Sequence, residues 1–272
     1  MTTPDSNTSS HSRSPHTQRG TQVVARVAAI LQAVAASETA GSTAAIALHT
    51  GLTRPTTHRL LTALADEGLV DRTENGNWAL GPELHILGTV AAQRYPAQEL
   101  ATPCLQRLAE ATGESAFFSA RRGNEVICLA RVEGSFPVRS HVLYEGLRLP
   151  LGVASAGIAI LGQLPPDQLE TALADTRDER QRLGSQHGDA HVRKLVARVR
   201  DHGWSLNPGR IVEGSWGMAA AVFDASGQPR YVLSLTGIES RFRAERRPQL
   251  GAALLDQAHK LSTALRTGAP SA

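Results

Sequence analysis

The sequence has little of several features that would assign it to a specialised class of protein. Only two of its 272 residues are cysteines, Cys104 and Cys128, which is too few for a disulfide framework and is typical of a reducing compartment. No apolar run approaches the ~20 residues that a membrane-spanning helix needs, and the polar N-terminus lacks the apolar core of a signal peptide. These absences predict a cytoplasmic protein that has no membrane partner.

The chain also lacks a strong charge of either sign. The formal net charge is +3, and seven arginines in the first 97 residues are balanced by seven acidic residues. Nucleic-acid binding therefore cannot be argued from net charge, and it depends on where the arginines lie. A hydrophobic fraction of 41% over 272 residues is enough for two packed domains.

Residues 42–64 have the pattern of two short helices joined by a tight turn. Ser42 or Thr43 can cap the first helix, because a hydroxyl there accepts an unpaired backbone N–H. Gly51 permits the positive φ of the turn, and Thr53 can cap the second helix. The pattern predicts a helix-turn-helix, whose second helix is suited to the DNA major groove.

The side chains of this second helix divide into two faces. At about 100° per residue, the inward face consists of Thr57, Leu60, Leu61 and Leu64. The outward edge, which normally reaches base edges, consists of Arg54, Pro55, Thr56, His58, Arg59 and Thr62. An arginine there can grip guanine or hold a phosphate. The alternative is an ordinary helix hairpin with solvated arginines.

Residues 69–80 predict a two-stranded wing after the second helix. The strands are expected at residues 69–72 and 77–80, because Asn75-Gly76 between them is a strong hairpin signal. The wing completes a winged helix, and Arg72 on it is a candidate phosphate contact.

Four stretches, residues 51–61, 68–70, 80–81 and 87–88, resemble the IclR family of bacterial transcription regulators. The likeness covers residues 21–268. It implies an α+β fold with an N-terminal winged helix-turn-helix, a linker helix and a C-terminal GAF-like effector domain with an antiparallel sheet. The expected domains are a disordered tail (1–20), the DNA-binding domain (21–81), the linker helix (82–97) and the effector-binding domain (98–268).

This resemblance also implies a function. The chain is expected to be a regulator, by family habit a repressor, that binds a pseudo-palindromic operator in double-stranded DNA as a homodimer or homotetramer. A small organic acid or related metabolite in the C-terminal domain would control it, without a cofactor or metal. Expected phosphate contacts are Arg26, Thr43 and Arg72, and expected base contacts are Arg54, Thr56, His58 and Arg59, with Pro55 on the same edge.

Apolar periodicity and turn residues predict the remaining elements. Helices are expected at residues 22–36, 83–94, 98–112, 152–164, from 165–166 onward, 189–202 and 245–265. Strands are expected at residues 115–120, 125–132, 138–143, 204–206, 217–224 and 230–237. The linker helix could pair two copies of the chain or dock on its own C-terminal domain.

Residues 149–159 resemble the effector-binding loop and helix start of the family. Small residues there let a ligand approach the backbone, and free N–H groups at a helix N-terminus attract carboxylates. Gly152 and Ile158 depart from the His and Lys that the family often has. The expected pocket residues are Val138, His141, Leu149, Ser155, Ala156, Asn207, Gly217, Ser234 and Thr236. Ser234 and Thr236, two apart on a strand, share a face.

Two other readings are kept open. Residues 152–157 nearly match the elbow of serine hydrolases, with Ser155 as the nucleophile. His187 and His191 have a spacing that can bind metal, although a solvated, helix-capping Asp189 is the simpler interpretation. The rival class of function is therefore a ligand-sensing or hydrolytic enzyme whose N-terminal module only dimerises.

Overall fold

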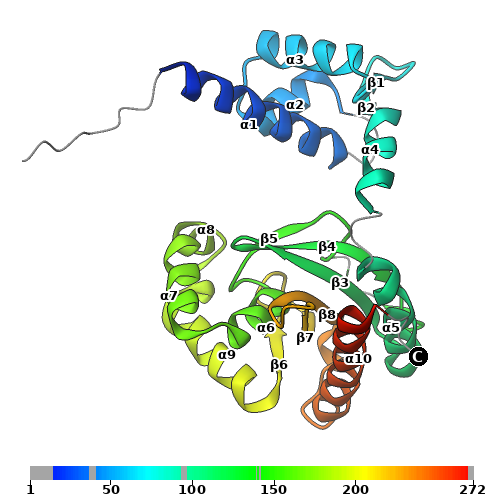
Figure 1. Ribbon diagram of the computed structural model, residues 1–272, viewed down its shortest axis with the longest axis vertical. Helices are drawn as coiled ribbons and strands as arrows, with labels where there is room; N and C mark the ends of the chain where they lie inside the picture. The colour runs from blue at the N-terminus through cyan, green and yellow to red at the C-terminus, as the bar shows by residue number, and fades with distance from the viewer. Residues whose placement is uncertain (1–14, 37–40, 93–96, 139, 141, 269–272) are drawn as a thin grey trace, which may run out of the picture. The chain divides into compact units, whose positions relative to one another are not determined.

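The computed structural model describes residues 15–36, 41–92, 97–138, 140 and 142–268. They belong to two compact units, which meet in the sequence between Tyr95 and Pro96 (Figure 1). Each unit has its own apolar core, so each can be understood from its own residues. In the described part of the chain, no helix has both the length and the apolar character needed to cross a membrane.

The N-terminal unit is a helix-turn-helix followed by a small hairpin. Its elements are α1 (Pro15–Ala35), α2 (Thr43–Thr50), α3 (Arg54–Asp66), β1 (Val70–Arg72), β2 (Trp78–Leu80) and α4 (Pro82–Ala92). Ile30, Ile46 and Leu61 bring one fully or almost fully buried side chain from each of the first three helices into a common core. The wing strands pair antiparallel, with Asp71 opposite Ala79.

The local signals around the turn act as the sequence predicts. The Ser42 side chain accepts a hydrogen bond from the Ala45 N–H at 3.2 Å, and that of Thr53 accepts from the Thr56 N–H at 3.4 Å. Gly51 closes α2 with a φ of 68°, a left-handed conformation that favours glycine. These caps fix where both helices begin and end.

The first helix is longer than its apolar pattern indicates. α1 begins at Pro15, so residues 15–20 are helical, where the sequence predicted part of a disordered tail. A proline at the first helical position blocks no intrahelical donor, which makes this start favourable. The rest of the expected tail, residues 1–14, lies outside the described residues.

The C-terminal unit is built on one antiparallel sheet of six strands, in the order β5-β4-β3-β8-β7-β6. The strands are β3 (Ser115–Arg122), β4 (Glu125–Val132), β5 (Arg148–Pro150), β6 (Trp204–Pro208), β7 (Ser215–Phe223) and β8 (Pro229–Ile238). The helices are α5 (Ala97–Thr112), α6 (Ser155–Gln163), α7 (Pro166–Asp175), α8 (Arg177–Arg182), α9 (Asp189–His202) and α10 (Arg247–Thr267). Short 3-10 turns span Ser185–His187 and Glu239–Arg241.

Helices cover both faces of this sheet (Figure 1). Leu233 and Leu235 of β8 pack with α5 and α10 on one face, whereas Val232 packs with α6, α7 and α9 on the other. Ser234 and Thr236 continue the row of Val232, because alternate residues of a strand share a face. The expected α+β fold with an antiparallel sheet is confirmed.

The strand expected at residues 138–143 does not form at the described positions of that segment, and β5 takes its place beside β4. A turn precedes β5, in which the Gly146 N–H donates to the Cys128 carbonyl and the Cys128 N–H donates to the Leu147 carbonyl. β4 is therefore already paired by the residues after the turn. Apolar alternation alone could not show whether residues 138–143 or β5 would pair with β4.

Candidate functional site

The outward edge of α3 is exposed, as its periodicity predicted. Arg54, Pro55, His58, Arg59 and Thr62 are exposed and Thr56 is half-buried, whereas Thr57, Leu61 and Leu64 are buried and Leu60 is half-buried. The cap of α3 holds the N-terminal end of this edge in place, since the Thr53 hydroxyl also donates to the Thr56 hydroxyl at 2.9 Å. Two arginines and a histidine are thus presented on one rigid helix.

Trp78, which the sequence analysis did not single out, joins the wing to the helix-turn-helix. Its indole N–H donates to the Thr43 hydroxyl at 2.9 Å, and its backbone forms a bridge with Gly41. The His58 ring meets the buried Trp78 ring edge to face at 6.4 Å, and the Arg72 guanidinium lies 5.8 Å from its centroid. A single buried ring therefore positions three of the expected DNA contacts.

These contacts refine the roles expected of the remaining basic and polar residues. Thr43 uses its hydroxyl oxygen as an acceptor from Trp78, which leaves its own O–H free to donate to a phosphate. Arg26 is exposed on α1 and Arg72 is exposed on β1. The structure places all of them at accessible positions of the N-terminal unit.

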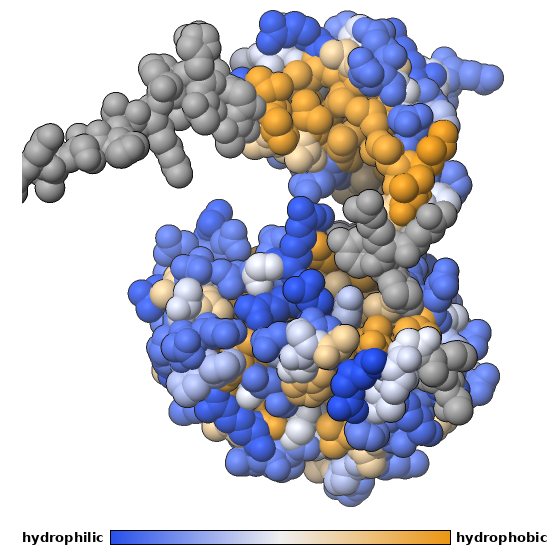
Figure 2. Space-filling model, in the orientation of Figure 1, coloured by the Kyte–Doolittle hydropathy of each residue, from blue (hydrophilic) through white to orange (hydrophobic). Residues whose placement is uncertain are grey.

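An apolar surface also covers part of the N-terminal unit (Figure 2). The large exposed apolar side chains of this unit are Val23 and Val24 of α1, Leu48 of α2, Leu80 of β2, and Ile86, Leu87 and Val90 of α4. Leu48 is 87% exposed and the three residues of α4 are between 52% and 56% exposed. Apolar patches of this kind are typical of protein–protein contacts.

The second candidate site is a small cavity between the sheet and the N-terminus of α6. Its volume is about 40 Å³. Seven expected residues line it, namely Leu149, Ser155, Ala156, Asn207, Gly217, Ser234 and Thr236. Asn207, Gly217 and Thr236 lie in one row across β6, β7 and β8, because their Cα atoms are register partners. The sheet thus collects residues that are distant in the sequence.

Two polar atoms of this cavity lack a hydrogen-bond partner among the residues that the structure describes. The Ser234 and Thr236 hydroxyl oxygens are buried and have no hydrogen-bond partner in the described structure. An unsatisfied buried hydroxyl is costly, so a partner at this position would be stabilising. Gly217 keeps the space open, since a Cβ on it would lie 3.1 Å from Ser155 Oγ.

Two expected pocket residues do not join this lining. Val138 is 54% exposed and is not among the residues that surround the cavity, because its segment forms a loop instead of a strand. His141 lies outside the described residues.

The cavity is also lined by residues that were not predicted from the sequence: Ser119, Val126, Cys128, Val142, Leu143, Leu147, Ala154, Ile211, Ser215 and Trp216. Val126 and Cys128, two apart on β4, could have been found by the same alternation that linked Ser234 to Thr236. Burial raises the pKa of the Cys128 thiol to about 12, so this lining sulfur is a neutral thiol at neutral pH.

The two departures, Gly152 in the loop before α6 and Ile158 within α6, have structural explanations. Gly152 has a φ of 95°, and a Cβ on it would lie only 2.7 Å from Cδ of Arg180. A larger residue at this position would therefore compete with the Arg180 side chain for space. Ile158 is fully buried in the core and does not line the cavity, so it faces inward.

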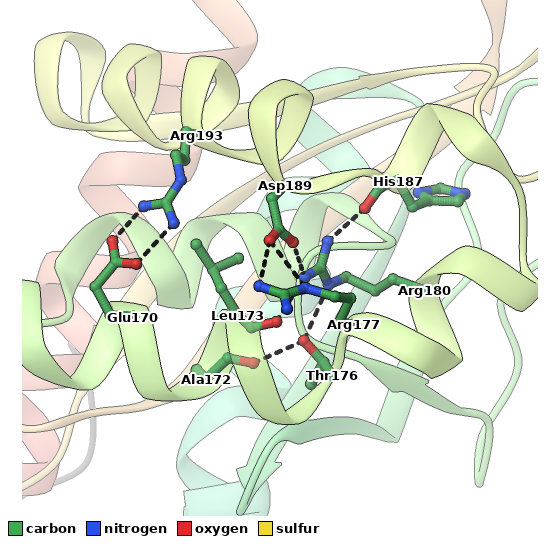
Figure 3. Close-up of polar contacts among 9 residues, drawn as sticks. All are labelled: Glu170, Ala172, Leu173, Thr176, Arg177, Arg180, His187, Asp189 and Arg193. Atoms are coloured by element: carbon green, nitrogen blue, oxygen red, sulfur yellow. Dashed lines mark hydrogen bonds and ion pairs between the residues drawn. The ribbon is translucent and has the colours of Figure 1, made fainter.

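Arg180 is the centre of a buried polar cluster behind this loop (Figure 3). It is fully buried, and it donates to the Thr176 hydroxyl, the carbonyls of Leu173 and His187, and the Asp189 carboxylate. Asp189 also pairs with Arg177 at 2.9 Å. The expectation of a solvated, helix-capping Asp189 is wrong, because Gly188 occupies the N-cap position of α9 and the Asp189 carboxylate is held by two arginines.

The positions of His187 and His191 do not support the hypothesis that these two side chains bind a metal ion. His187 is buried in the 3-10 turn before α9, whereas His191 is exposed in the first turn of that helix. The described residues contain no group of three or more His, Cys, Asp or Glu side chains that could hold a metal ion.

Replacement of His187 by glutamine is expected to reduce the loss of stability in acid. Burial, and next the charge of Arg210, lower the pKa of His187 from 6.5 to about 4. Below pH 6.5 the unfolded chain binds a proton that the folded chain does not take up until about pH 4. The contribution of this residue to the free energy of unfolding therefore falls as pH falls through that window, by roughly 1–3 kcal/mol.

Urea denaturation at neutral pH and at about pH 4.5 measures this effect, as the difference in pH dependence between the two proteins. His259→Gln, at an exposed histidine, is the control. The same acid sensitivity in His187→Gln and wild type would contradict the prediction.

The lining of the cavity does not resemble a hydrolytic site. Ser155 lies in the wall, but no His, Asp or Glu is among the described residues that line the cavity. A serine nucleophile needs a neighbouring base within hydrogen-bond reach. The near match to a hydrolase elbow therefore reflects the tight loop before α6.

Family models match both the N-terminal helix-turn-helix and the C-terminal unit. The model of the bacterial transcriptional regulator IclR C-terminal domain matches residues 89–263, and that of the IclR helix-turn-helix domain matches residues 23–74. The first match alone spans more than half of the chain.

Individual relatives are similar over nearly the whole chain. The transcriptional repressor IclR of Escherichia coli K12 is 26% identical over 246 residues, which cover 89% of each chain. The repressor AllR of the same organism is 28% identical over 252 residues, which cover 92% of this chain and 93% of that one. An IclR homologue from Microbacterium hydrocarbonoxydans, solved with 4-hydroxybenzoate, has the same fold, with a TM-score of 0.74 at 23% identity over 90% of this chain and 99% of that one.

Proposed function

Because the chain belongs to the IclR family of bacterial transcription regulators, which are not enzymes, we propose that it represses transcription from a pseudo-palindromic operator. The observation that carries this proposal is the exposed, arginine-bearing edge of α3, which is held rigidly by its cap and by Trp78. The regulator would act in the cytoplasm, where bacterial DNA lies.

Base contacts are assigned to Arg54, Thr56, His58 and Arg59, with Pro55 beside them. Arg26, Thr43 and Arg72 are assigned to phosphates, because phosphate contacts set the register of a protein on the duplex while base contacts set its specificity. The Trp78 indole N–H supports the assignment of Thr43, since it holds the Thr43 hydroxyl at the N-terminal end of α2. The two sets of residues should respond differently to the DNA sequence.

A single winged helix of this size reads only one half-site, so the chain is proposed to act as a homodimer or homotetramer. The exposed apolar residues of α4, Ile86, Leu87 and Val90, support a contact between two copies. A helix of this composition is stabilised when its apolar side chains leave water. A two-fold contact of this kind would present two α3 helices to a symmetric operator.

The effector is proposed to be a small organic acid or related metabolite that binds in the cavity at α6. Support comes from the two unpaired hydroxyls and from the start of α6, whose first backbone N–H groups have no partner within the helix. The cavity of about 40 Å³ is far smaller than the roughly 300–1,000 Å³ of drug-sized ligand sites. Binding of a larger molecule would therefore require a conformation in which the cavity is wider. A ligand that binds only this conformation would shift the protein's conformational equilibrium toward it.

Footprinting of the DNA upstream of the gene and its neighbours tests the proposal. We expect two protected half-sites related by two-fold symmetry, and a change in operator affinity of about 5- to 150-fold when the effector saturates the protein. A screen of metabolites for release of the mapped operator identifies that effector. Protection of a single half-site would contradict the symmetric assembly. An operator affinity that no bound metabolite changes would contradict the regulation.

A further inference from the structure

Behind the wall of the effector cavity lies a positive charge that no acidic residue of the described structure neutralises. Arg210 is 9% exposed, and its side chain donates to Asn207 Oδ1 and to the carbonyls of Gln186 and Val153. All three acceptors are neutral, and the distances of 3.3–3.4 Å are long for a guanidinium. Among the described residues, Arg210 makes no ion pair with a carboxylate.

Arg180, a second buried arginine of the same unit, differs from Arg210 in having a carboxylate partner. Arg180 is also buried, but the Asp189 carboxylate lies 2.5 Å from its Nη2. A buried charge is costly unless it is paired. Burial lowers the pKa of Arg210 to about 10, which still leaves the guanidinium charged at neutral pH. Arg210 therefore lacks what Arg180 has, a negative partner.

Asn207 connects this charge to the cavity. Its Oδ1 accepts from both the backbone N–H and Nε of Arg210, at 3.2 Å and 3.3 Å. This fixes the orientation of the amide, because only the oxygen can accept, and it leaves the NH₂ group as the part that can donate to a ligand. Asn207 lines the cavity in the same cross-strand row as Thr236.

The other polar groups of the cavity are suited to the same kind of ligand. The unpaired hydroxyl of Ser234, a residue that is 1% exposed, lies on β8 close to that row. The hydroxyls and the amide can all donate to a carboxylate, and no acidic side chain is among the described lining residues. No Lys or Arg is among the described lining residues either, and within the described part of the chain Arg210 is the buried cation that bonds to a lining side chain.

We infer that Arg210, acting through Asn207, selects a ligand with a single carboxylate for this cavity. The carboxylate would accept from the Asn207 amide and the Ser234 and Thr236 hydroxyls, and its charge would balance that of Arg210. A second carboxylate would be buried against apolar wall residues such as Leu149 and Ile211 without a cation. Monocarboxylates are therefore favoured over both neutral analogues and dicarboxylates. This inference rests on the proposed effector site and makes Arg210 a positioning residue.

Calorimetric titration of the full-length protein without DNA tests the inference. The probes are matched acid and amide pairs, namely acetate and acetamide, lactate and lactamide, and 4-hydroxybenzoate and 4-hydroxybenzamide, together with the dicarboxylates malonate and succinate. Wild type is expected to bind at least one acid ten or more times more tightly than its amide, and more tightly than either dicarboxylate. A panel in which no acid is preferred over its amide overturns the inference.

Two variants of Arg210 separate its charge from its packing. Arg210→Gln is expected to lose the preference for the acid over its amide, and Arg210→Lys, which keeps the charge, is expected to retain part of it. A merely structural role would weaken binding of both members of a pair equally. An unchanged preference in Arg210→Gln overturns the inference.

Asn207→Asp keeps the acceptor for Arg210 and gives it a negative partner, so the variant remains informative if Arg210→Gln fails to fold. We expect affinity for the acid to fall at least tenfold and by more than affinity for its amide, because only the acid is repelled by the new carboxylate. The midpoint of thermal unfolding without ligand should rise. Gln228→Glu, at an exposed position of the same unit, controls for the added charge. A lower midpoint, or unchanged acid affinity, overturns the inference.

Operator binding by the same proteins keeps the two proposals apart. If a variant loses the preference for the acid but still binds the operator, the result bears on the role of Arg210 and not on the proposed DNA binding. Selective acid binding that leaves operator affinity unchanged would instead contradict the proposed regulation.

Discussion

Replacement of Asp189 by alanine is expected to lower the free energy of unfolding of the C-terminal unit by about 3–5 kcal/mol. The Asp189 carboxylate is the only negative partner that the structure gives to the fully buried Arg180. Without it, the guanidinium would remain in the core with only the Thr176 hydroxyl and two carbonyls as acceptors. Removing one member of a buried pair is far more costly than the pair is worth, because the other charge is left uncompensated.

Glu170→Ala is the matched control for this experiment. Glu170 of α7 forms a bidentate ion pair with Arg193 of α9 (Figure 3). Both side chains of this pair are largely exposed. Exposed pairs contribute roughly 0–1 kcal/mol, so this variant should unfold close to wild type. Urea denaturation followed by circular dichroism compares the three proteins.

Asp189→Asn separates charge from hydrogen bonding. The amide keeps an acceptor for Arg180 but carries no charge, so its loss of stability should lie between those of wild type and Asp189→Ala. If Asp189→Ala were no less stable than Glu170→Ala, Arg180 would not depend on Asp189.

Replacement of both Arg54 and Arg59 by alanine is expected to abolish most specific binding to the operator. Each direct base contact is worth about 1–3 kcal/mol, so the double variant should lose roughly 2–6 kcal/mol of operator affinity. Both side chains are exposed on α3 and do not contribute to the core of the N-terminal unit, so folding should be unaffected. Fluorescence anisotropy with the footprinted operator and with scrambled DNA of equal length measures the loss.

Two further variants define what this loss means. Arg72→Ala removes an expected phosphate contact, so it should weaken binding to the operator and to scrambled DNA alike. Arg122→Ala, at an exposed position of the C-terminal unit, should leave both unchanged. The rival function, an N-terminal module that only dimerises, predicts that the double variant retains DNA as well as wild type.

Prediction from the sequence succeeded where a structure depends on neighbouring residues. The caps at Ser42 and Thr53 and the turn at Gly51 involve bonds across three or four residues, so their chemistry can be read directly. The exposed edge of α3 followed from helical periodicity alone. The pocket was a different case, because most of its residues were proposed from the resemblance, with alternation along β8 as the only independent signal.

The failures share a physical cause. The segment at residues 138–143 has strand-like residues, but β5 occupies the edge beside β4, and that competition is settled between distant segments. Trp78 went unnoticed because its partners at Gly41, Thr43 and His58 lie well before it in the chain. Asp189 has the local appearance of a cap, and only the packing of α8 against the following 3-10 turn brings Arg180 to it.

What the sequence by itself determined about this protein is its local plan: the helix-turn-helix, the wing and the family. Caps, turns and side-chain periodicity act over a few residues, so they need no knowledge of the fold. Only the tertiary structure decided that, among the described residues, Arg180 has a carboxylate partner and Arg210 has none. Whether a buried charge is paired depends on which distant segments meet, and the sheet and its helices settle that jointly.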